Sequence, residues 1–219
     1  MALWDDKTAA EATGGRAQGT WEAARIEIDS RRVKPGDLFV AIKGENFDGH
    51  EFVGDAFKKG AAAVAVSKPV QGNHLLVPDA LKGLEALGRY ARARSRAKII
   101  GVTGSVGKTS TKEMVRLALS AHGETYATSG NFNNHIGTPL SLANLPPDTP
   151  FAVFEMGMNH AGEISHLTTM VRPHIAVITN IEAVHLEFFG TIEKIAEAKA
   201  EIFEGVEKGG TAIININGN

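Results

Sequence analysis

The segment KIIGVTGSVGKTS, residues 98–110, joins an apolar run to a glycine-rich turn and then to a stretch that can form a helix. The same three parts follow one another in phosphate-binding loops, because glycines let backbone N–H groups approach phosphate oxygens at the positive end of a helix. Lys108 would add a charge for the β- and γ-phosphates, and Thr109 would bind Mg²⁺. The segment predicts a nucleotide site rather than a plain glycine turn with an exposed lysine.

The loop departs from the strict pattern G-x-x-x-x-G-K-[ST], because Val102 stands where the first glycine is expected. What remains is T-G-x-x-G-K-T, which still follows a strand and opens a helix. We expect the nucleotide to be bound by Thr103, Gly104, Ser105, Val106, Gly107, Lys108, Thr109 and Ser110.

From residue 98 onward, apolar strands alternate with amphipathic helices. Strands are expected at 98–103, 151–155, 175–180 and 212–216. Helices should begin near Lys108, Ile136, Gly162 and Ile192. Apolar strands separated by helices predict a parallel sheet that is covered on both faces and binds ligands beyond the strand C-termini. Since the chain stops soon after its last strand, we expect this sheet to be truncated.

The first third of the chain has a different pattern, with shorter strands. They are expected at 24–28, 37–42, 61–66 and 75–77, with a helix at 50–59. A second helix at about 79–94 leads into a basic stretch. We expect a small mixed α/β domain over residues 1–95 and a parallel-sheet domain over residues 96–219.

Composition excludes several classes of partner. The chain has 219 residues, a formal net charge of −2 and no cysteine. Neither nucleic acid nor an anionic membrane is therefore expected as a partner. No run reaches the length of a membrane span, and residues 1–15 are unlike a secretory signal. The lack of cysteine excludes disulfides and thiol chemistry and fits the cytoplasm. We expect a cytoplasmic protein, and a monomer.

Two polar residues follow predicted strands at the edge of the sheet where the phosphate loop lies. Glu155 ends the strand at 151–155 and could be a second Mg²⁺ ligand. His185 lies in the loop after the strand at 175–180. A glutamate at a strand end can also face solvent, and a lone loop histidine is more often structural than a metal ligand. Only its position favours a functional role for His185.

Lys199 interrupts the apolar face of a helix predicted over 192–208. At 100° per residue it shares that face with apolar residues, while glutamates occupy the opposite face. The apolar residues are Ile195, Ala198, Ile202, Phe203 and Val206. Because burying an ammonium is costly, Lys199 must reach solvent, pair with another group, lose its proton or be chemically modified.

Together these motifs resemble the Mur ligase family over nearly the whole chain. The matching segments are Asp29–Ile42, Asp48–His50, Thr103–Thr109, Asn131–Pro139, Phe154–Gly157, His185–Glu187 and Ala198–Phe203. Several motifs in the right order are more specific than any one alone. The resemblance implies a UDP-sugar-binding domain followed by an incomplete P-loop ATPase domain, with the family's C-terminal domain absent.

The resemblance also implies roles for individual residues. The UDP-muramoyl substrate would be bound by Ser30, Arg31, Asp48, Gly49, His50, Asn133 and Asn134. Two Mg²⁺ ions would be bound by Thr109, Glu155, His185 and Lys199, the last as a carbamate formed with CO₂. Lys108, Lys199, Asn134 and His185 would take part in catalysis. Of these, Lys108 would bind the ATP phosphates, and Asn134 would lie near the γ-phosphate and the substrate carboxylate.

The implied reaction is ATP-dependent ligation of D-alanyl-D-alanine to UDP-N-acetylmuramoyl tripeptide through an acyl phosphate, in peptidoglycan precursor synthesis. The Gly-Ser pair after Thr103 and the run Phe154–Gly157 favour this ligase over relatives that add one amino acid, or glutamate to folate. A non-catalytic nucleotide-binding module and a P-loop phosphatase or switch are further alternatives. We expect that the chain alone does not complete ligation.

Overall fold

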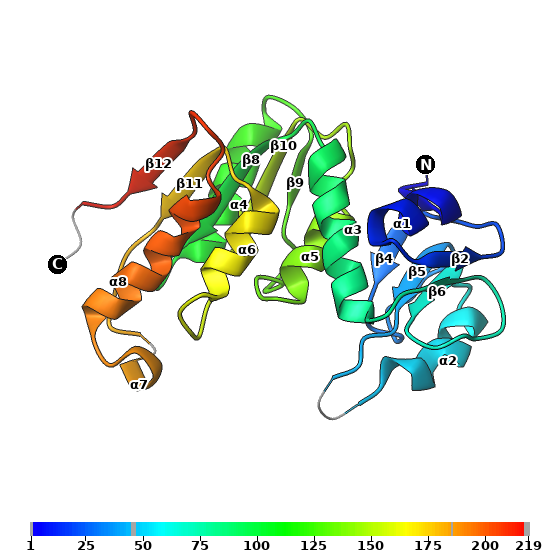
Figure 1. The fold of residues 1–219 in the computed structure, drawn as a ribbon. Coiled ribbons are helices and arrows are strands. Elements are labelled where there is room, and N and C mark those ends of the chain that lie inside the picture. The colour runs from blue at the N-terminus through cyan, green and yellow to red at the C-terminus, as the bar shows by residue number, and fades with distance from the viewer. Residues whose placement is uncertain (1, 45–46, 185, 217–219) are drawn as a thin grey trace. The chain divides into compact units, whose positions relative to one another are not determined.

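The computed structural model describes residues 2–44, 47–184 and 186–216. The chain folds into two compact units, Met1–Tyr90 and Ala91–Asn219 (Figure 1). Helix α3 (Ala80–Arg94) contains the end of the first unit and the start of the second. Each unit combines a sheet with helices, which confirms the predicted α/β class. None of the described helices is long and apolar enough to cross a membrane.

The first unit is built on a five-stranded sheet. Its strands lie in the order β2 (Arg16–Gln18), β7 (His74–Leu76), β6 (Ala63–Val66), β5 (Asp37–Val40) and β4 (Arg25–Glu27). Neighbouring strands are parallel except β2 and β7. A 3₁₀ turn (Gly49–Phe52) leads into α2 (Val53–Lys58), whose buried face shares an apolar cluster with β5 and β6. The strands and the first helix predicted for this region are confirmed to within a few residues.

The start of the chain carries elements that its apolar pattern does not predict. Strand β1 (Trp4–Asp5) pairs with β3 (Glu22–Ala23), and α1 (Asp6–Thr13) follows β1. The Thr8 N–H donates to Asp5 Oδ1 at 2.7 Å, and the Asp5 N–H donates to Thr8 Oγ1 at 3.2 Å. This capping box satisfies the first N–H groups of a helix that buries only Ala9. The helix depends on its cap more than on a hydrophobic face.

The second unit is a sheet in which all strands are parallel. The strands lie in the order β12 (Thr211–Ile214), β11 (Ile175–Ile178), β8 (Lys98–Thr103), β10 (Phe151–Glu155) and β9 (Thr125–Ala127). The four strands predicted here are confirmed. The additional edge strand β9 is short and only partly buried, so it lacks the apolar run that marks the others.

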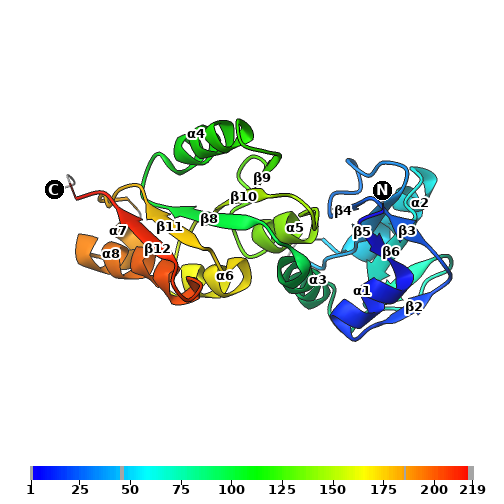
Figure 2. The ribbon, with the colours of Figure 1, turned by 90° about the horizontal axis from the view of Figure 1, so that it is seen from above.

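Helices cover both faces of this sheet (Figure 2). On one face, α4 (Lys108–Ser120) packs Val115 and Leu119 against Ile100 and Val102 of β8. The other face carries the larger core, formed with α5 (Gly137–Ala143), α6 (Glu163–Val171) and α8 (Ile192–Ala200). The short helix α7 (Leu186–Phe189) precedes α8. The expected cover on both faces is confirmed.

Helix α8 is shorter than the helix predicted over 192–208, and a 3₁₀ turn (Glu201–Gly205) follows it. The Glu201 carboxylate accepts two backbone N–H groups at the start of α6, at 2.6 and 3.0 Å. The Thr168 hydroxyl donates to the carbonyl of Ile202 at 2.8 Å. The carbonyl of Ile202 accepts this hydroxyl, while the N–H of Val206, its partner in an α-helix, donates to the carbonyl of Phe203. The α-helical hydrogen-bond pattern therefore does not continue, and the prediction was wrong in length.

Candidate functional site

The phosphate loop joins β8 to α4, and its shape requires glycine at two positions. Gly104 has φ +150°, and a Cβ atom there would lie 1.9 Å from Thr179 Oγ1. Gly107 has φ +80° at the N-terminus of α4, a left-handed conformation that glycine adopts without steric cost. Both glycines were predicted to bind phosphate, and both keep the loop backbone free of side chains.

The segment after β11 holds the other side of the loop. The Ser105 hydroxyl donates to the carbonyl of Glu182 at 3.1 Å and accepts the Glu182 N–H at 2.9 Å. The Val106 N–H donates to Asn180 Oδ1 at 2.9 Å. Sequence reasoning did not identify Asn180 as a site residue. Its place just beyond a parallel strand, where such sheets bind ligands, was the signal that could have found it.

Lys108 places its ammonium over the loop. Its Nζ donates to the carbonyls of Gly104 at 2.8 Å and Ser105 at 3.3 Å. Burial lowers the pKa of Lys108, while the nearby carboxylate of Glu155 favours the charged form. The phosphate oxygens of a nucleotide would compete with the loop carbonyls for these donors.

Glu155 ends β10 next to Val102 of β8 and is 2% exposed. Its Oε2 accepts the Thr109 hydroxyl at 2.9 Å, and its Oε1 accepts Nδ2 of Asn133 at 2.7 Å. Because Glu155 is buried, the alternative that this glutamate merely faces solvent is excluded. Sequence reasoning placed Asn133 among substrate-binding residues and missed its contact with Glu155.

Thr109 and Glu155 fit a Mg²⁺ ion. They bring a hydroxyl and a carboxylate oxygen together beside the phosphate loop. Mg²⁺ prefers oxygen ligands, and in nucleotide sites the protein supplies only some of them while phosphate and water supply the rest. Among residues 2–44, 47–184 and 186–216, no cluster of three or more His, Cys, Asp and Glu side chains could hold a metal. Within the described residues, Thr109 and Glu155 would hold the ion together with phosphate oxygens. His185, a further predicted ligand, lies outside the described residues.

Lys199 lies in α8 and is 2% exposed. Its ammonium therefore does not reach solvent, which excludes one of the alternatives drawn from the sequence. Burial first, and then the charge of Lys108, lower the pKa of Lys199 to about 8. A lysine with this pKa is partly neutral near physiological pH, and the neutral amine is the form that reacts with CO₂.

Asn134 is exposed and shapes the start of α5. Its Oδ1 accepts the N–H groups of Ile136 at 3.1 Å and Gly137 at 2.9 Å. It also lines a pocket of about 550 Å³ together with Gly157 and Glu163. Of the two neighbouring asparagines, Asn133 contacts the buried carboxylate and Asn134 faces this pocket.

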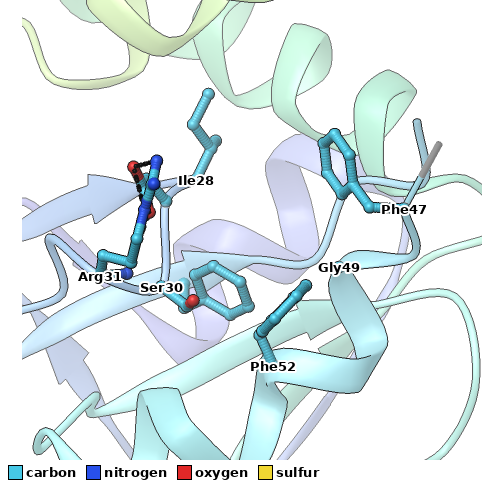
Figure 3. Close-up of a pocket in the computed structure, with 8 residues that line it drawn as sticks. Ile28, Ser30, Arg31, Phe47, Gly49 and Phe52 are labelled. Carbon is cyan, nitrogen blue, oxygen red and sulfur yellow. Dashed lines mark hydrogen bonds and ion pairs between the residues drawn. The ribbon is translucent and has the colours of Figure 1, made fainter. Parts of the chain in front are cut away.

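The first unit has its own pocket, of about 520 Å³ (Figure 3). Its lining residues are Ile28, Asp29, Ser30, Arg31, Phe39, Phe47, Gly49 and Phe52. Arg31 turns toward Asp29, with Nη2 2.7 Å from Oδ2, and this contact lowers the pKa of Asp29 to about 2. Phe47 and Phe52 are 59% and 37% exposed. A basic group and apolar rings thus meet at one pocket.

The predicted substrate residues of the first unit divide into two groups. Ser30, Arg31 and Gly49 line the pocket. Asp48 and His50 instead contact each other, with His50 Nδ1 2.5 Å from Asp48 Oδ1. His50 Nε2 accepts the Ser67 N–H at 2.9 Å, so Nδ1 carries the proton that is donated to Asp48. This pair secures the loop around Gly49.

Comparison with known proteins adds a family assignment. Residues 102–219 match the Mur ligase middle domain, and residues 22–116 match the Mur ligase family catalytic domain. The chain is 45% identical to the UDP-N-acetylmuramoyl-tripeptide--D-alanyl-D-alanine ligase of Rickettsia prowazekii, over 99% of this chain and 49% of that protein. The Escherichia coli enzyme of the same name is 43% identical over 89% of this chain and 43% of that protein.

Solved structures agree with the sequence matches. MurF from Acinetobacter baumannii is 38% identical and superposes with a TM-score of 0.88, over 99% of this chain and 49% of that chain. MurF ligase from Thermotoga maritima in complex with ADP is 37% identical with a TM-score of 0.77, over 88% of this chain and 46% of that chain. The chain spans about half the length of the curated relatives it matches.

Proposed function

We propose, because this chain belongs to the Mur ligase family, that it is the substrate- and nucleotide-binding part of a peptide ligase. The ligase adds D-alanyl-D-alanine to UDP-N-acetylmuramoyl tripeptide at the expense of ATP, in cell-wall precursor synthesis. The observation that carries this proposal is the contact of 2.9 Å between Thr109 Oγ1 and Glu155 Oε2 beside the phosphate loop. The ligases to which the chain is 37–45% identical bear that activity in their names.

The two parts of the chain have separate tasks in this proposal. Residues 1–95 bind the UDP-muramoyl substrate at the pocket of the first unit, where Arg31 and Ser30 face its polar groups and the phenylalanines its apolar ones. Residues 96–219 bind ATP at the phosphate loop. Charge on Arg31 suits a diphosphate, since guanidinium groups pair with phosphate oxygens in a fixed planar geometry.

The chemistry is phosphoryl transfer followed by acyl transfer. The terminal carboxylate of the tripeptide attacks the γ-phosphorus of ATP, giving an acyl phosphate and ADP. The amine of D-alanyl-D-alanine then attacks the acyl carbon, loses a proton and displaces inorganic phosphate. Lys108 offsets negative charge on the transferring group, and most of the rate enhancement comes from positioning and electrostatics. Thr109 and Glu155 would hold Mg²⁺, which would supply further charge neutralisation.

Lys199 also has a role in the proposal, as a metal ligand after chemical modification. Its neutral amine adds to CO₂ and loses a proton, giving a carbamate that turns a buried cation into an anion. That anion and His185 would hold a second Mg²⁺ ion. The lowered pKa of Lys199 supports this modification, because it raises the neutral fraction of the amine.

Crossed variants test the two binding sites in the 219-residue chain. We would titrate the wild type, Arg31→Ala and Lys108→Met by calorimetry with UDP-N-acetylmuramoyl tripeptide and, separately, with ADP plus Mg²⁺. Arg31→Ala should weaken UDP-substrate binding at least about tenfold and leave ADP binding unchanged, because it removes a charged hydrogen-bond donor. Lys108→Met should have the reverse effect.

Each variant is the matched control for the other, since each removes one cation from a different unit. Binding of ADP without binding of the UDP-substrate would refute the assignment of the first pocket. In that case a folate or a shorter muramoyl peptide would be titrated as the acceptor. Loss of both ligands in either variant would indicate unfolding rather than a lost contact.

A further inference from the structure

Lys112 is a buried cation that the proposed reaction does not use. It lies in α4, one helical turn after Lys108, and is 1% exposed. Its Nζ donates to the carbonyl of Thr128 at 2.7 Å and to that of Gly130 at 3.5 Å, and lies 3.2 Å from Glu113 Oε1. An ammonium is retained in a protein interior only where such acceptors replace its hydration. An apolar side chain would fill the space at lower cost.

The segment held by Lys112 leads to the carboxylate of the candidate metal site. Thr128 Oγ1 accepts the N–H of Glu155 at 3.4 Å. Further along the same segment, Asn133 Nδ2 donates to Glu155 Oε1 at 2.7 Å, and the carbonyl of Asn133 accepts the N–H of Gly157 at 2.8 Å. Two side chains of residues 128–133 thus contact Glu155, one at its backbone N–H and the other at its carboxylate.

These contacts close a ring. The Thr109 hydroxyl, which donates to Glu155 Oε2, belongs to the same helix as Lys112. The ring therefore runs from Lys112 through residues 128–133 to Glu155 and returns to α4 at Thr109. One helix fixes both the hydroxyl and, through the segment, the direction in which the carboxylate points.

We propose that Lys112 is a positioning residue that orients Glu155 through Asn133 and thereby sets the affinity of the nucleotide site for Mg²⁺. This inference rests on the proposed function, because it takes Thr109 and Glu155 as the metal ligands. Without the ammonium, the carbonyls of Thr128 and Gly130 lose their donor, and the segment carrying Asn133 shifts. Residues that orient metal ligands in this way commonly change metal affinity by about 10- to 100-fold.

The test is a Mg²⁺ titration of the 219-residue chain in the presence of ADP. Lys112→Met should weaken Mg²⁺ binding about tenfold, while ADP binding in EDTA stays within about twofold of the wild type. Lys112→Arg, which retains a cationic donor, should recover part of the loss. Arg116→Met is the matched control, because Arg116 lies on the same helix and pairs with Glu113 at the surface at 2.7 Å. It should leave Mg²⁺ affinity unchanged.

A double variant separates positioning from general stability. If Lys112 acts through Asn133, the effects of Lys112→Met and Asn133→Ala on Mg²⁺ affinity will not add in the double variant. Additive effects, or wild-type Mg²⁺ affinity in Lys112→Met, would overturn the inference. Lys112→Gln is the second neutral variant, and unfolding of both neutral variants would assign Lys112 to stability alone. If the wild type fails to bind ADP with Mg²⁺, the proposed function itself is refuted and this inference falls with it.

Discussion

Replacing Lys199 with methionine should stabilise the second unit near neutral pH. Lys199 is 2% exposed, and its pKa falls from the ordinary 10.5 to about 8, first through burial and then through the charge of Lys108. At about 1.36 kcal/mol for each pH unit, the folded state disfavours the cation by about 3 kcal/mol. Methionine fills a similar space without a charge, so we expect the variant to be more stable by up to that amount at pH 7.

The pH dependence follows from the direction of the shift. Well below pH 8, both the folded and the unfolded chain carry the proton on Lys199, and the full penalty is present. Between pH 8 and 10.5, the unfolded chain binds a proton that the folded chain has released, so wild-type stability rises relative to the variant. The advantage of Lys199→Met should therefore disappear across this window.

Urea unfolding in CO₂-free buffer at pH 7, 8, 9 and 10.5 measures this difference. Both tryptophans, Trp4 and Trp21, belong to the first unit, so fluorescence follows that unit alone while far-ultraviolet circular dichroism follows both. The two signals separate the transitions if the units unfold independently. A variant that is less stable than the wild type at pH 7, or a gap that stays constant with pH, would refute the reasoning.

Adding ¹³C-labelled bicarbonate extends the same experiment to carbamate formation. With a pKa of about 8, about a quarter of Lys199 is neutral at pH 7.5, against about one in a thousand for an ordinary lysine. We expect one carbamate signal in the carbon NMR spectrum of the wild type and none in Lys199→Met. A wild-type spectrum without that signal would contradict the role proposed for Lys199.

Two further predictions concern the phosphate loop and the pocket of the first unit. Gly104→Ala should weaken ADP binding by at least about tenfold, because its Cβ would lie 1.9 Å from Thr179 Oγ1 and push the phosphate loop out of place. Calorimetry checks this against Gly162→Ala, because Gly162 also has a positive φ, of +85°, but nothing lies within 4 Å of the new Cβ. Hydrogen bonds with Arg31 are the main reason why the pKa of Asp29 is lowered to about 2. The ionised carboxylate therefore stabilises the fold above pH 3.8, and this stabilisation is lost as pH falls toward 2. The tryptophan-monitored stability of the wild type should therefore fall more between pH 4 and pH 2 than that of Asp29→Asn, and equal losses would show that the pair does not stabilise the fold.

Much of the fold could be predicted because its central strands are continuous apolar runs. Strands β8, β10 and β11 and the phosphate loop between β8 and α4 are local patterns, and the sequence alone places them. Helix α1 could not be found in this way, since its stability comes from a cap at Asp5 and not from an apolar face. The early end of α8 depends on contacts with α6, which is distant in the sequence.

The candidate site shows the same division. Glu155 was identified because it ends an apolar strand near the phosphate loop, where a carboxylate could bind a metal. Lys199 was identified because it interrupts the apolar face of a helix, where a charge is unexpected. Lys112 carries no such mark, because its acceptors are backbone carbonyls that any sequence would provide. Asn180 is recognised only in the structure, where the segment after β11 contacts the phosphate loop.

The order of strands in the second unit has a consequence for how this site could change. After β8 the chain moves across the sheet in one direction, with α4 on one face, and after β10 it moves in the other direction, with α6 on the opposite face. Right-handed crossovers that leave neighbouring strands in opposite directions open a crevice between their first turns. The closeness of the phosphate loop to Glu155 is thus a property of chain topology. Side chains that follow these two strands can therefore be exchanged for others without rebuilding the core beneath.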